Sequence, residues 1–234
     1  MLKTFVKLVM HQFAQNYPQL MNQALAAKYT VSDLVLLRDA FLFAQEMANG
    51  YYRAQAIPLL NHLVTTASIA MAEKADSELV VVALLHAAHV MHHFDGPGQE
   101  HDSLDRRALL RTRFGERIET MLWNYEHMRW WSRDSVIEYF NHASDLNQES
   151  RDLLMIRLAN ELDDHLDGAM GYSFKGRKDE RSGTMIQLYQ KLAERLEFNV
   201  ISSCLVEEMK NGIDPPAELR WNRDQGYRWN PDGD

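Results

Sequence analysis

The chain has 234 residues, 46% apolar and 25% charged, which is typical of a globular protein and excludes a disordered or collagen-like chain. Its 33 acidic residues outnumber the 25 basic ones, and the net charge of −8 excludes a general attraction for nucleic acid or for an anionic membrane. A single cysteine, Cys204, excludes a disulfide framework and a zinc site built from several cysteines. Of the ten histidines, four lie between His86 and His93.

Apolar residues recur at intervals of three and four along most of the chain, which is the period of an α-helix. The first such pattern covers 34–44 and follows Ser32, which is expected to be the N-cap. The next covers 59–72 and follows Pro58, a residue that suits the first turn of a helix. Further helices are expected over 78–93, 107–125, 135–142, 150–166 and 182–209. Because no segment alternates with a period of two for long enough to form a sheet, the predicted fold class is all-α.

Two segments rich in glycine and charge, 95–105 and 168–183, are predicted to be loops, and the second is a candidate cover over a site. A polar tail with aromatic residues occupies 212–234. The longest uncharged run, 79–94, is shorter than the roughly 20 residues that span a bilayer and contains four histidines. The N-terminal segment carries two lysines and no signal-peptide cleavage site. We expect a cytoplasmic protein with no membrane partner.

The histidine cluster allows two interpretations. On a helix over 78–93, the residues His86, His89 and His93 lie at i, i+3 and i+7 and share one face, where three imidazoles could hold a divalent metal. His62, on the preceding helix, lies 24 residues upstream of His86 and could face it from an antiparallel neighbour. Alternatively, one or two of these side chains are buried and hydrogen-bonded, while His92 and His93 interact with the negative end of the helix dipole.

Five ordered segments of 33–198 resemble the HD superfamily, and specifically the hydrolase domain of RelA/SpoT-type alarmone enzymes. They read YYRAQAIPLLNH (51–62), LLHAAH (84–89), RFGERI (113–118), IRLANEL (156–162) and TMIQLYQKLAERL (184–196). The resemblance implies the HD-domain helical fold for 33–200. It leaves 1–32 as an N-terminal helical extension and 201–234 as the end of the last helix and a tail.

The resemblance implies a metal centre of two histidines and two aspartates, usually on manganese, which activates water against a pyrophosphate ester. His62 and His86 match the two histidines, whereas the two aspartates are replaced by Ala87 and Asn160. A hard cation prefers carboxylate oxygen, so these replacements predict that the manganese-dependent hydrolysis is lost. The predicted cofactor is none, or a divalent metal (Mn, Fe or Zn) held weakly by His62 and His86, with His89 as an extra ligand.

The first functional hypothesis is a divergent HD-fold protein that binds a nucleotide-like or phosphorylated small molecule. Arg53, at a position that the resemblance places beside the nucleotide, would clamp an anion, unless it pairs with a nearby carboxylate instead. Asn160 and Asp164 would complete the ligand site, Asp164 standing where the resemblance implies an asparagine near the sugar.

Two enzyme hypotheses stay open beside it. One is a metal-dependent hydrolase or oxygenase with a rebuilt site, in which His62, His86 and His89 are ligands and Asp163 or Asp164 is a base or fourth ligand. The other is a metal-free biosynthetic enzyme, in which His86 or His89 acts as general acid/base and Asp163 orients it. The expected partner is a small molecule and not a nucleic acid, and a homodimer stays open.

Overall fold

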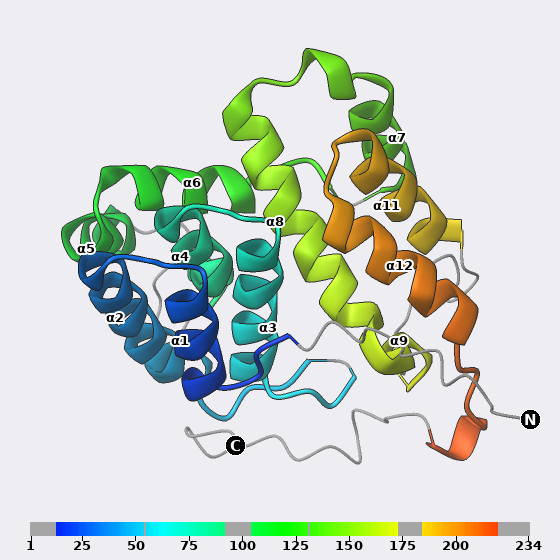
Figure 1. Cartoon of the computed structure of the whole chain (residues 1–234), viewed down its shortest axis with the longest axis horizontal. Coiled ribbons are helices and arrows are strands. Elements are labelled where there is room, and N and C mark those ends of the chain that lie inside the picture. Colours follow the sequence, from blue (N-terminus) through cyan, green and yellow to red (C-terminus); the bar gives the residue numbers. More distant parts are fainter. Residues whose placement is uncertain (1–12, 54, 92–103, 131, 173–183, 220–234) are drawn as a thin grey trace, which may run out of the picture.

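The computed structural model describes residues 13–53, 55–91, 104–130, 132–172 and 184–219. In these ranges the regular structure is helical, apart from one isolated bridge between Tyr52 and Pro58. Figure 1 shows the long helix α8 running diagonally between two groups, with α1 to α6 on one side and α7, α11 and α12 on the other. The helices are α1 (Tyr17–Ala26), α2 (Val31–Ala48), α3 (Leu59–Ala72), α4 (Ser77–Leu85), α5 (Leu104–Phe114), α6 (Glu116–Glu126), α7 (Arg133–Asn141), α8 (Gln148–His165), α9 (Ala169–Tyr172), α11 (Thr184–Arg195) and α12 (Asn199–Asn211).

The sequence predicted the bounds of α3 correctly but misplaced the start of α2. The N-cap of α2 is Thr30, whose hydroxyl accepts a hydrogen bond from the Asp33 backbone N–H at 3.3 Å. The Asp33 carboxylate in turn accepts from the Thr30 N–H at 2.9 Å, which completes a capping box. The expected cap, Ser32, is therefore wrong, because it lies inside the first turn and its hydroxyl meets that of Thr30 at 2.8 Å.

The helix predicted over 78–93 is too long, because α4 ends at Leu85. Beyond it the backbone makes tight turns, with the Ala88 N–H donating to the Leu85 carbonyl at 2.8 Å. The Arg106 guanidinium, reaching over from α5, donates to the His89 carbonyl. His89 therefore does not share a helical face with His86, and His93 lies outside the described residues.

Two predicted helices are each divided in two. The one over 107–125 breaks at Gly115, which has φ +91°, a left-handed value that favours glycine. The one over 182–209 breaks after α11, where Glu197 has φ +63° and the Phe198 N–H donates to the Ala193 carbonyl at 2.9 Å. Each break turns the chain back, so α6 packs against α5 and α12 against α11.

Three buried helices position the candidate site. α3 is buried on nearly all sides, and α4 is buried along its whole apolar length from Leu79 to Leu85. α8 packs against α3, and its inward face is buried through its last turn. The short helix α9 lies within the predicted loop 168–183, and most of that loop, of the loop 95–105 and of the aromatic tail lies outside the described residues. None of the helices described here combines the length and apolar composition needed to cross a bilayer.

Candidate functional site

The centre of the site is a pair of histidines, His62 from α3 and His86 at the C-terminal end of α4. Their Nε2 atoms lie 3.2 Å apart and their rings meet edge to face. Both side chains are buried, with 0% and 6% of the residue exposed. Two helices that are apolar on almost every side therefore place two imidazoles against each other in the interior of the protein.

The Nδ1 nitrogen of each ring is hydrogen-bonded to an oxygen atom. The Nδ1 of His62 lies 2.5 Å from the Asp163 carboxyl group on α8. The Nδ1 of His86 donates to the Ala83 carbonyl at 2.7 Å. A carbonyl oxygen can only accept, so His86 carries its hydrogen on Nδ1 and presents a lone pair at Nε2.

The lone pair of His86 Nε2 faces a second neighbour on α8. The amide nitrogen of Asn160 lies 2.8 Å from it, and the same nitrogen donates to the Tyr125 hydroxyl at 3.1 Å. Burial raises the pKa of Tyr125 to about 12, so this hydroxyl stays protonated. A chain of polar contacts thus runs from Asp163 through His62, His86 and Asn160 to Tyr125.

Burial disfavours charge along this chain. It lowers the pKa of His62 to about 3, and the positive charge of Arg53 acts in the same direction. It also raises the pKa of Asp163 well above its ordinary value, with repulsion from Asp164 adding to the effect. Both shifts therefore oppose an ion pair between His62 and Asp163.

The four-ligand manganese centre does not fit these residues. Ala87 is buried and supplies no ligand atom, and Asn160 presents an amide where a carboxylate is needed. The buried group His62, Asp163 and Asp164 has ligand-type atoms within 4.8 Å of one another. Asp163, however, is bound to Nδ1 of His62, on the far side of that ring from His86. Two neutral imidazoles and an amide suit a softer divalent ion better than manganese.

Arg53 lies beside the histidine pair in the loop between α2 and α3, and its guanidinium is occupied. Its Nη2 donates to Oδ2 of Asp164 and its Nε donates to Oδ1 at 3.2 Å, forming a two-pronged ion pair. Gln55 donates to the same Oδ1 at 3.1 Å. Burial alone would raise the pKa of Asp164, but the charge and hydrogen bonds of Arg53, together with the nearby His62 and His165, outweigh it and lower that pKa. The carboxylate that pairs with Arg53 in this structure is thus Asp164.

Most of the residues predicted for the site lie together in the structure, whereas His89 lies apart from them. His62, His86, Asn160 and Asp163 form one connected group. His89 turns away, and its ring lies edge-on to Trp123 of α6. Tyr125 and Gln55 also reach the site, from α6 and from the loop before α3. The sequence did not predict their contacts with Asn160 and Asp164, because each contact joins residues far apart in the chain, 35 and 109 positions.

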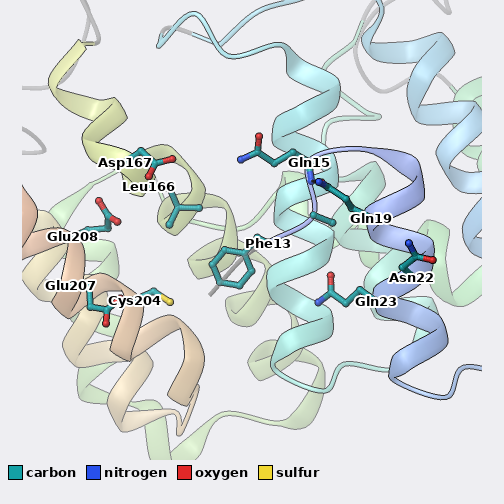
Figure 2. Close-up of a pocket in the computed structure, with 11 residues that line it drawn as sticks. Phe13, Gln15, Gln19, Asn22, Gln23, Leu166, Asp167, Cys204, Glu207 and Glu208 are labelled. Carbon is teal, nitrogen blue, oxygen red and sulfur yellow. Dashed lines mark hydrogen bonds between the residues drawn. The ribbon is translucent and has the colours of Figure 1, made fainter. Parts of the chain in front are cut away.

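A separate cavity of about 600 Å³ lies between the first turn of α1, the end of α8 and α12. Figure 2 shows amide side chains on one side of it, carboxylates on the other, and Phe13 between them. It is lined by Phe13, Ala14, Gln15, Gln19, Asn22, Gln23, Leu166, Asp167, Cys204, Glu207 and Glu208. None of the residues predicted for the site is among them.

No protein-family model matches the chain, and no curated protein matches it in sequence. In three dimensions the chain is similar to a metazoan ortholog of SpoT, which hydrolyses ppGpp and plays a role in starvation responses. The two have 16% sequence identity and a TM-score of 0.52, and the likeness covers 78% of this chain and 96% of the other. The predicted all-α, HD-domain fold is therefore confirmed, and at this level of identity the likeness establishes the fold alone.

Proposed function

We propose that this is a catalytically divergent HD-fold protein that binds a nucleotide-like or phosphorylated small molecule and lacks manganese-dependent pyrophosphate hydrolysis. The fold carries the first half of this proposal, since the SpoT ortholog with the same fold acts on a nucleotide. Arg53 would provide the anion contact, because its planar guanidinium matches phosphate as well as carboxylate.

The observation that carries the second half is the contact between Asn160 and His86. At 2.8 Å, the amide nitrogen takes up the lone pair that a metal ion would need. The chain of contacts from Asp163 to Tyr125 satisfies these buried polar groups by hydrogen bonds between protein groups, and Ala87 offers no carboxylate nearby. This arrangement supports a centre that is stable without manganese.

Two measurements on the purified chain test the proposal. With manganese present, no release of pyrophosphate from ppGpp is expected, and turnover would contradict the loss of hydrolysis. In a thermal-shift experiment, ppGpp or GDP is expected to raise the unfolding temperature, and the shift should disappear in Arg53→Ala. Arg38→Ala is the matched control, because Arg38 also pairs with an aspartate but is half exposed on α2. Equal shifts in both variants would contradict a role for Arg53.

A rebuilt metal centre is the second candidate, and the orientation of the histidine pair favours it. Each ring is hydrogen-bonded at Nδ1 to an oxygen atom, as metal-bound histidines commonly are, and turns its Nε2 toward the other ring. His62 and His86 would hold a zinc or iron ion, which could supply Lewis-acid or oxidative chemistry. Metal analysis of protein purified without chelator separates the candidates, because one zinc or iron per chain would overturn the metal-free centre.

A further inference from the structure

We propose that Asp164 is an internal competitor for Arg53, which restricts the site to ligands that carry a phosphate or pyrophosphate group. This inference rests on the proposed function and names the chemistry that the site selects. Asp164 accepts hydrogen bonds from Nε and Nη2, an edge of the guanidinium on which an anion can bind with two parallel hydrogen bonds. A ligand that binds Arg53 through this edge must therefore displace this carboxylate.

The charge and the geometry of a ligand decide whether it can displace Asp164 from Arg53. A carboxylate offers the guanidinium one negative charge and two oxygens, which is what Asp164 already provides. A phosphate group carries a charge of about −1.5 to −2 at neutral pH and three acceptor oxygens. The internal carboxylate therefore excludes ligands whose only anion is another carboxylate, while a phosphate can still compete.

The surroundings of the Arg53–Asp164 ion pair would allow an anion to displace the aspartate. The Arg53 side chain is 29% exposed, whereas that of Asp164 is 11% exposed, so an incoming anion reaches the arginine from solvent while the aspartate stays inside. Gln55 donates one hydrogen bond to Asp164, but its own buried Oε1 accepts none from the described residues. The hold of Gln55 on Asp164 is therefore a single hydrogen bond.

Calorimetric titration of the 234-residue chain with inorganic pyrophosphate, without divalent metal, tests the competition. Asp164→Asn keeps the shape of the side chain but removes its charge, so the Kd for pyrophosphate should fall about tenfold or more, as expected for a lost charge-assisted contact. Asp39→Asn is the control, because it removes one carboxylate from an exposed Arg–Asp pair on α2 and should leave the Kd unchanged. Gln55→Ala weakens the hold on Asp164 without altering charge and should lower the Kd about two- to fivefold; it covers the case in which Asp164→Asn does not fold.

The outcomes of the pyrophosphate titration distinguish the competition from the proposed function. Tighter binding in Asp164→Asn or Gln55→Ala, lost when Arg53→Ala is added, supports the competition. Equal binding in the wild type and both variants overturns it but leaves the proposed function standing. Absence of pyrophosphate binding from the wild type and from every folded variant overturns the competition, and a simultaneous lack of any thermal shift with ppGpp or GDP overturns the proposed function as well.

Discussion

The amide nitrogen of Asn160 lies 2.8 Å from Nε2 of His86, where the resemblance to SpoT-type enzymes implies an aspartate facing a shared metal ion. An amide at this position, in place of a carboxylate, changes what can bind to the imidazole. The carboxylate would be a metal ligand, whereas the amide is a hydrogen-bond donor that satisfies the imidazole directly. His62 and His86 thus lie within a series of polar contacts between protein groups.

Restoring the two carboxylates should restore manganese binding. In Ala87→Asp/Asn160→Asp, two hard oxygen ligands join the histidine pair, so the variant should bind manganese at least tenfold more tightly than the wild type. Electron paramagnetic resonance measures this directly, because bound manganese loses the sharp signal of the free ion. Asn160→Asp alone is the control and should give an intermediate affinity. Wild-type affinity equal to that of the double variant would refute the idea that these two positions remove the metal.

The start of α2 gives a test of local structure. Thr30→Ala removes the side-chain half of the capping box and should lower the free energy of unfolding by about 0.5–2 kcal/mol. Ser32→Ala, the cap expected from the sequence, should change it by no more than about 0.5 kcal/mol. Urea unfolding of both variants ranks the two positions, and a larger loss in Ser32→Ala would contradict the observed cap.

The break between α5 and α6 depends on one glycine. Gly115 has φ +91° and ψ 167°, and a Cβ added there meets nothing within 4 Å, so any cost of a side chain is conformational. Gly115→Ala should therefore destabilise the fold by about 1–3 kcal/mol. Gly212→Ala, at the end of α12, is the matched control because its φ is −47° and a Cβ there makes ordinary contacts. Thermal unfolding of the two variants should differ clearly, and equal melting temperatures would argue against the left-handed turn.

Helical periodicity was enough to predict the fold class and the bounds of α3, because it marks the side of each helix that is buried. The spacing of His62 and His86 on neighbouring helices, together with the family resemblance, predicted that the two side chains approach each other. The sequence did not predict where α4 ends, since the run after His86 stays apolar while a distant side chain, Arg106, takes the His89 carbonyl. The partner of Arg53 was left open for the same reason. Asp164 lies 111 residues away, and only the packing of α8 against α3 brings the two together.

A buried carboxylate between α5 and α6 makes stability depend on pH. Glu119 is fully buried and accepts hydrogen bonds from Arg107 and, at 2.8 Å, from Arg111. Burial alone would raise the pKa of Glu119, but the hydrogen bonds and charges of the two arginines outweigh it and lower that pKa. A carboxyl group whose pKa is lower in the folded than in the unfolded state stabilises the fold above its unfolded pKa of about 4.3, and this contribution is lost as the pH falls toward the folded pKa.

Glu119→Gln should therefore lower the free energy of unfolding by about 1–3 kcal/mol at pH 7, because it removes the charge that both arginines bind. The difference from the wild type should shrink at pH 4, where part of the wild-type contribution is already lost. Urea unfolding at the two pH values measures both effects, with Glu116→Gln as the control, since Glu116 is exposed at the start of α6. A difference that stays constant between pH 7 and pH 4 would mean that Glu119 stabilises the two helices by packing and not by its charge.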